Sequence, residues 1–162
     1  MDMVIRVAKE IRGYTLGEAE RLCDEIFQKQ PVAMAYVVVL SRRGVPFPLL
    51  DHALHLLMVI YACFREAGVE LEDINEDMLA KAWNSTISMA RFFAGEPCET
   101  ERDRLIALGV TGYPEPFLLA YWVTCAKEEF LRDGFTAETG LVLGATKSLL
   151  DCFVQASAGK GT

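Results

Sequence analysis

The sequence contains only two histidines, and its five cysteines include no Cys-x-x-Cys pair. A zinc site with three histidine ligands is therefore excluded, because there is no third histidine. The Gly-x-Ser-x-Gly turn of the α/β hydrolases is also absent, as are the glycine-rich loops that bind phosphate. The chain thus lacks the sequence patterns of several common enzyme classes.

Clusters of basic residues are missing as well. The 162 residues carry a net charge of −7, and the sequence pI is about 4.9. Proteins that bind nucleic acid use stripes of lysine and arginine to neutralise the phosphate backbone. Arg42 and Arg43 precede Gly44 and are typical of cations at the C-terminus of a helix. We therefore expect no nucleic-acid partner.

The cysteines are scattered and odd in number, which favours reduced thiols and a cytoplasmic location. Four of them lie in apolar helical patterns, so only Cys98 is expected to be exposed. The segment from Met1 to Arg6 has an acidic second residue and no apolar stretch long enough for a signal peptide.

Apolar residues recur at spacings of three and four, with capping residues before many segments and glycine after them, which predicts helices. The predicted helices cover Thr15 to Gln28, Val32 to Arg43, Pro46 to Ala67, Asn75 to Ala94, Thr100 to Leu108, Pro116 to Arg132, and Thr136 to about residue 157. The valines at 37–39 favour a strand by propensity, so a strand is the alternative to a helix in this segment. We expect an all-α, compact, single-domain bundle of six or seven helices over residues 1–157, and a disordered tail at residues 158–162.

The segment from Val45 to Phe64 is almost continuously apolar and contains both histidines, His52 and His55. It is either the buried central helix of the domain or one wall of a binding site. It is long enough to span a bilayer, but Asp51 would cost roughly 2.5–3.5 kcal/mol near the middle of a membrane. We therefore expect no membrane partner.

The two histidines lie three residues apart and would project from nearly the same face of a helix. They leave a tetrahedral metal site short by two ligands, so we expect no metal and no other cofactor. If the two histidines line a cavity, the candidate small-ligand site comprises Asp51, His52, His55, Tyr36 and Tyr121. Such a pocket would suit a small apolar or aromatic ligand and could belong to an enzyme.

A weak internal repeat is also present. Pro31, Ala35 and Tyr36 recur at the same offsets as Pro116, Ala120 and Tyr121, and each set leads into a helix, a glycine-marked turn and a second helix. The second helices end in Cys-Phe pairs at residues 63–64 and 152–153. Two interpretations stay open: two similar helical hairpins packed about a pseudo-twofold axis, or coincidence among apolar helices.

The last predicted helix contains the pattern Gly140-x-x-x-Gly144. This spacing of small residues allows two helices to approach each other closely. We expect that packing role rather than a membrane role.

Hydrophobic residues make up 52% of the chain, so several helices are apolar around much of their circumference. A single small domain cannot bury them all, and large exposed apolar patches normally mark interfaces. We therefore expect a twofold homodimer, with Phe117, Tyr121 and Trp122 as the candidate interface residues. The leading hypothesis is a non-catalytic interaction or scaffold protein, an adaptor or regulator with an unknown protein partner; the alternative is the ligand-binding protein described above.

Overall fold

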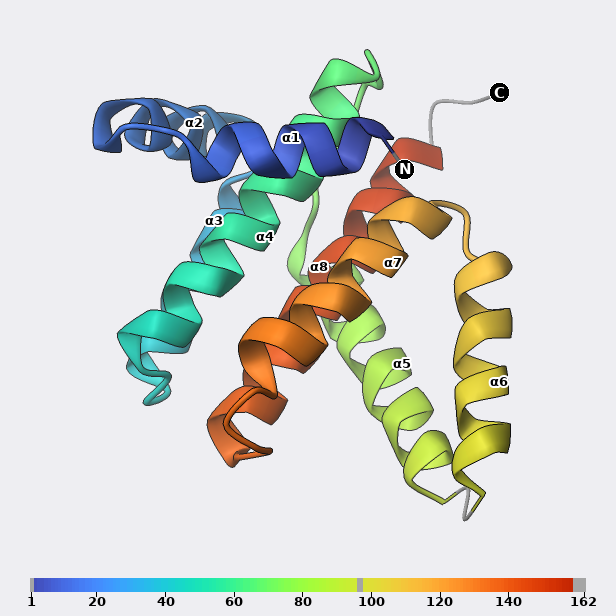
Figure 1. Cartoon of the computed structure of the whole chain (residues 1–162). Helices are drawn as coiled ribbons and strands as arrows, with labels where there is room; N and C mark the ends of the chain where they lie inside the picture. The colour runs from blue at the N-terminus through green and yellow to red at the C-terminus, as the bar shows by residue number, and fades with distance from the viewer. Residues whose placement is uncertain (1, 96–97, 159–162) are drawn as a thin grey trace.

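The computed structural model describes residues 2–95 and 98–158, except for the side chains of residues 93 and 94. Within these residues the chain forms eight α-helices and one π-helical turn, and no strand (Figure 1). The elements are α1 (Asp2–Arg12), α2 (Leu16–Lys29), α3 (Pro31–Arg42), α4 (Phe47–Glu66), α5 (Glu76–Ala94), α6 (Glu99–Thr111), α7 (Pro116–Cys125), η1 (Ala126–Phe130) and α8 (Ala137–Ala158). The prediction of an all-helical bundle is confirmed.

Helix α4 lies at the centre of the fold and packs against α1, α3 and α8. It begins after the extended residue Pro46, has Pro48 in its first turn, and is followed by Gly68, whose φ of 67° takes the chain out of the helix. Every residue from Leu56 to Phe64 is buried. The apolar segment noted in the sequence is therefore a core helix, and the two histidines lie in its first half.

The first helix, α1, was not among the predicted helices, which numbered seven at most. Its buried residues are Val4, Val7, Ala8 and Ile11, a spacing of three and four that forms one apolar face against α4. Its polar face is exposed, and Arg6 forms an ion pair with Glu66 at the end of α4. The pattern was present in the sequence, but it is short and carries no N-cap signal.

The three predicted capping residues act as expected. Thr15 and Glu18 form a complete capping box at the start of α2. The side chain of Asn75 accepts the backbone N–H of Met78, and Thr136 accepts that of Thr139. These bonds satisfy backbone donors that have no partner within their helices.

The helix predicted at Val32 to Arg43 is confirmed, whereas one expected helix boundary needs correction. The valines at 37–39 lie in α3, because burial of Val37 and Leu40 in the core outweighs their strand propensity. Gly109, expected to end its helix, lies inside α6, which continues to Thr111 and is capped at Gly112. A single glycine lowers helix stability by only about 1 kcal/mol and does not end a helix by itself.

Helices α5 and α8 approach closely at Gly144. A Cβ atom added there would lie 2.6 Å from the ring of Trp83 on α5, so only glycine fits without movement. At Gly140 the neighbour is the ring of Phe135, in the loop before α8, rather than another helix. The expected packing role is therefore confirmed at Gly144 but not at Gly140.

The tail predicted for residues 158–162 lies mostly outside the described residues, and Ala158 is the last residue of α8. Among the described residues one helix, α4, is long and apolar enough to cross a membrane, and 56% of its most apolar window is buried within the protein. A buried core helix meets the same criteria of length and composition.

Candidate functional site

A cluster of polar side chains lies where α1, α4, α7 and η1 meet. Helix α4 contributes His52 and His55, and the last residue of α1 contributes Arg12. Tyr121 comes from α7, and Glu129 comes from the π-helical turn η1 that continues it. The structure therefore brings three of the five predicted ligand-site residues together, with two charged residues that the sequence did not single out.

Glu129 joins α1 to α4 through its carboxylate. Its Oε1 accepts a hydrogen bond from Nη2 of Arg12 at 2.7 Å, and its Oε2 lies 3.2 Å from Nδ1 of His52. The second contact has ion-pair distance without hydrogen-bond alignment, and Oε2 is itself buried. The carboxylate is therefore held mainly by Arg12, with the His52 ring as a close neighbour.

The π-helical turn positions Glu129 toward the histidines. Its backbone bond from the N–H of Leu131 to the carbonyl of Ala126 spans five residues instead of four. The wider turn also places the buried Phe130 ring edge-on against His52, with ring centroids 6.0 Å apart. Such turns occur often at functional sites, which makes this cluster the strongest candidate site.

His55 and Tyr121 are both half-buried and form the second part of the cluster. His55 Nε2 and the Tyr121 hydroxyl are 3.1 Å apart and share a hydrogen bond. Burial, with a smaller effect from the positive charge of Arg12, lowers the pKa of His55 to about 4. His55 is therefore neutral at pH 7. Burial also raises the pKa of Tyr121 above its ordinary value, so the pair is uncharged.

Cys125 lies one turn after Tyr121 and is buried beside it. Burial raises the pKa of its thiol to about 11. A thiol with that pKa is protonated at neutral pH and is a poor nucleophile. The cluster therefore contains a neutral histidine and a protonated thiol, and it does not include an activated thiolate.

The other predicted site residues lie elsewhere. Asp51 is exposed on α4 and acts on His55 only through its charge. Tyr36 on α3 is half-buried against α8, where its hydroxyl interacts with Ser148. Tyr36 is thus part of the α3–α8 contact, away from the histidine cluster.

The predicted interface residues on α7 differ in exposure. Phe117 is exposed, whereas Tyr121 and Trp122 are half-buried. The indole N–H of Trp122 donates to the Thr146 hydroxyl of α8 at 2.9 Å. The polar atoms of Tyr121 and Trp122 are therefore bonded within the chain, and only Phe117 presents a large apolar surface to solvent.

The structure contains a second cluster of polar side chains, which was not predicted from the sequence. Asp151 accepts hydrogen bonds from the Tyr113 hydroxyl at 2.5 Å and from Lys147 Nζ at 2.6 Å. The Lys147 ammonium also lies 5.0 Å from the centre of the Tyr113 ring. The lysine and the aspartate are four residues apart in a largely apolar helix, and that spacing could have indicated the pair in the sequence.

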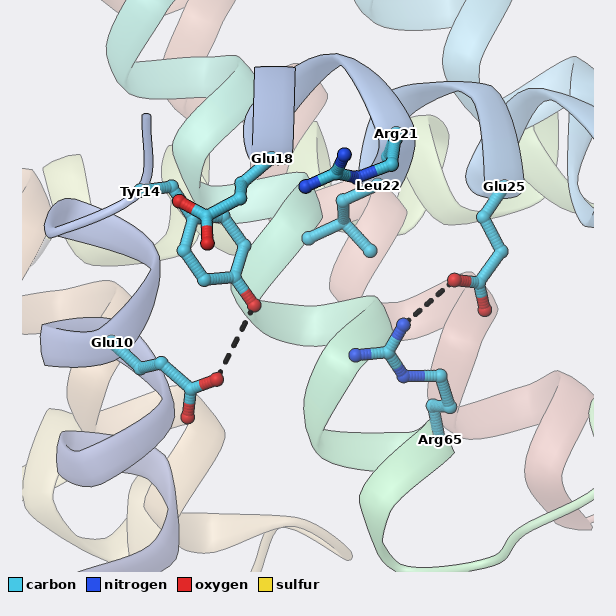
Figure 2. Close-up of a pocket in the computed structure, with 7 residues that line it drawn as sticks. All are labelled: Glu10, Tyr14, Glu18, Arg21, Leu22, Glu25 and Arg65. Carbon is cyan, nitrogen blue, oxygen red and sulfur yellow. Dashed lines mark hydrogen bonds and ion pairs between the residues drawn. The ribbon is translucent and has the colours of Figure 1, made fainter. Parts of the chain in front are cut away.

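Two surface pockets lie at the C-terminal end of α4, and both include Arg65. The smaller, of about 250 Å³, is open to solvent and lies between α1, α2 and α4 (Figure 2). In it Arg65 donates to Glu25 at 2.7 Å, and Tyr14 donates to Glu10 at 3.4 Å. The larger, of about 460 Å³, lies beside the loop between α4 and α5. Neither pocket is lined by His52 or His55.

Within the described part of the chain, no three His, Cys, Asp or Glu side chains are grouped closely enough to hold a metal ion. The comparisons with known proteins give no relative: no family model, no curated protein and no solved structure matches this chain. The function must therefore be inferred from the geometry of the chain alone.

Proposed function

We propose that this chain is a non-catalytic helical interaction protein, an adaptor or regulator, that acts as a homodimer in the cytoplasm. The cytoplasmic location is supported by the cysteines, all five of which the structure describes and none of which forms a disulfide. The acidic net charge of −7 supports partners other than nucleic acid.

The observation that carries this proposal is the outer face of α3. Ala35, Val38 and Val39 are exposed on this face, and no charged residue occurs from Pro31 to Ser41. A surface helix normally carries charged side chains on its solvent face. An uncharged face of this length on an acidic protein is typical of a surface that another protein covers.

The alternative function, binding of a small apolar or aromatic ligand near His52 and His55, has weaker support. His55 is bonded to Tyr121, and His52 lies against Glu129 and Phe130. The two pockets described above are lined by other residues, and most of those that line the smaller pocket are charged. A ligand at the histidines would have to displace these internal contacts.

Sedimentation equilibrium of the full chain at micromolar concentration tests the proposal. We expect a single species of twice the 18.0 kDa chain mass. A monodisperse monomer would exclude the homodimer.

A further inference from the structure

We propose that the outer face of α3 is the dimer interface and that two copies pair it antiparallel about a twofold axis, with the basic end of each α3 beside the acidic end of the other. This inference rests on the homodimer proposed above and adds the surface and the orientation. The partner is a second copy of this chain, because the charge pattern described below is complementary to itself.

The centre of the interface is an apolar stripe. Ala35, Val38 and Val39 recur at spacings of three and four, and Val38 and Val39 are 53% and 41% exposed. The opposite side of α3, with Val37 and Leu40, is buried in the core. The helix is therefore apolar on both sides, but only one side is covered within the chain.

The C-terminal end of this stripe is basic. Arg42 continues the same spacing from Val38 and Val39, and Arg43 follows it as the helix cap. Both side chains are exposed, and neither forms an ion pair with another described residue. Two free guanidinium groups thus flank one end of an uncharged surface.

The N-terminal end of α3 is acidic because a loop is fixed beside it. Gln30, the buried residue just before α3, donates to the carbonyl of Glu72 at 3.0 Å and accepts the backbone N–H of Ile74 at 2.9 Å. These bonds hold the exposed side chains of Glu72 and Asp73 at this end, and neither forms an ion pair among the described residues. Lys29 and Arg65 lie beside Asp73, but Arg65 is paired with Glu25, so the two carboxylates of Glu72 and Asp73 outnumber the one remaining cation.

This distribution of charge selects one orientation. Antiparallel pairing of two α3 helices would bring Arg42 and Arg43 of each copy to Glu72 and Asp73 of the other. Parallel pairing would place arginine against arginine and carboxylate against carboxylate, which is unfavourable. Because a twofold axis repeats every contact, the antiparallel arrangement forms the favourable contact twice.

The stripe needs flanking residues to reach the size of a stable interface. A helix of 12 residues is about 18 Å long, and a standard interface buries roughly 800 Å² on each partner. Phe27 lies in the last turn of α2, just before α3, and Phe47 begins α4, just after it. Both rings are exposed and can extend the apolar surface at the two ends.

The first test introduces a charge at the centre of the stripe. Val38→Glu should weaken the dimer about a hundredfold, because it buries an unpaired carboxylate at the interface. Ile5→Glu is the matched control, since Ile5 is 52% exposed on α1 and should leave dimerisation unchanged. Circular dichroism verifies that each variant is folded. If the wild type is a dimer and folded Val38→Glu dimerises equally well, the α3 interface is wrong while the homodimer stands.

The second test exchanges the charges and does not alter the apolar stripe. Arg42→Glu/Arg43→Glu and Glu72→Lys/Asp73→Lys should each weaken the dimer about tenfold or more, because each makes both end contacts repulsive. The chain that carries all four substitutions should dimerise like the wild type, since both contacts are again attractive in the antiparallel arrangement. If the two double variants dimerise normally, or if the fourfold variant is weaker than either, the antiparallel pairing is wrong. A monomeric wild type in the same experiment would instead overturn the proposed homodimer.

Discussion

The rings of Phe64 on α4 and Phe153 on α8 stack against each other, with centroids 6.1 Å apart and planes 18° from parallel. Each follows a buried cysteine, Cys63 or Cys152, at corresponding places in the internal repeat of the sequence. Corresponding residues meet each other when they lie near a twofold axis that relates two halves of a structure. The contact supports a duplicated hairpin, α3–α4 and α7–α8, although the duplication itself stays a prediction.

Removing one ring of this pair should destabilise the fold. Phe153 is fully buried and also meets the edge of Tyr61, so Phe153→Ala leaves a cavity between α4 and α8. Such substitutions cost about 3–5 kcal/mol in the free energy of unfolding. Equilibrium unfolding in urea measures this loss. Phe117→Ala, at an exposed position, should cost less than about 1 kcal/mol, and equal losses for the two variants would contradict the central role of the stack.

The approach of α5 to α8 makes a second prediction, at Gly144. Gly144→Ala places a methyl group 2.6 Å from the Trp83 ring, which must move or rotate away. We expect a loss of about 1–3 kcal/mol from overpacking, larger than the gain of up to about 1 kcal/mol in helix propensity. The shift in the thermal unfolding midpoint shows whether Gly144→Ala destabilises or stabilises the protein.

Gly140→Ala is the matched control in the same helix. Its new methyl group would meet the Phe135 ring, which is 74% exposed and free to swing into solvent. This variant should therefore be neutral or slightly more stable than the wild type. If Gly140→Ala destabilises the protein as much as Gly144→Ala, the explanation from the Trp83 contact is wrong.

Local sequence signals were sufficient to predict most of the fold. The capping residues Thr15, Asn75 and Thr136 and the apolar spacing between them identified seven of the eight helices. Helix α1 was missed because eleven residues with one buried face and no N-cap signal make a weak local pattern. The valines at 37–39 favour a strand by propensity, yet they lie in the predicted helix, because their environment in the folded chain, which a sequence does not display, decides the outcome.

The candidate site was predictable only in part. The histidine spacing correctly placed His52 and His55 near one another, and Tyr121 reaches His55 from a helix distant in sequence. Arg12 and Glu129 could not be assigned to them, because their positions depend on how α1 packs and on the extra residue in the π-helical turn. Tyr36 was grouped with the histidines by residue type alone, and the fold takes it to α8.

The lowered pKa of His55 predicts that stability falls in mild acid. The unfolded chain binds a proton at His55 near pH 6.5, whereas the folded chain does so only near pH 4. Between these values the unfolded state therefore binds more protons, and the free energy of unfolding decreases as pH falls through this window. Since His55 is partly exposed, we expect a decrease of roughly 2 kcal/mol. Chemical denaturation at a series of pH values measures this decrease in the free energy of unfolding.

Other groups titrate near the lower end of this window, so the comparison must be made between variants. His55→Gln keeps a neutral hydrogen-bonding side chain next to Tyr121 and should remove the His55 part of the pH dependence. His52→Gln removes a histidine of the same helix but retains His55. The free energy of unfolding of this variant should therefore still decrease as pH falls from 6.5 to about 4. If the free energy of unfolding depends on pH in the same way in the wild type and in His55→Gln, the pKa of His55 is not lowered in the folded chain.

The ion pair of Lys147 and Asp151 gives the last prediction. The lysine side chain is only 6% exposed, whereas that of the aspartate is 26% exposed and also accepts the Tyr113 hydroxyl. Asp151→Asn leaves a buried ammonium without a countercharge and should cost about 3 kcal/mol. Lys147→Met leaves a carboxylate that solvent and Tyr113 still stabilise, so it should cost about 1 kcal/mol. A double-mutant cycle in urea should therefore show that the combined variant loses less than the sum of the single losses. Strict additivity would mean that the two charges do not stabilise each other, and the contact would then be a consequence of packing alone.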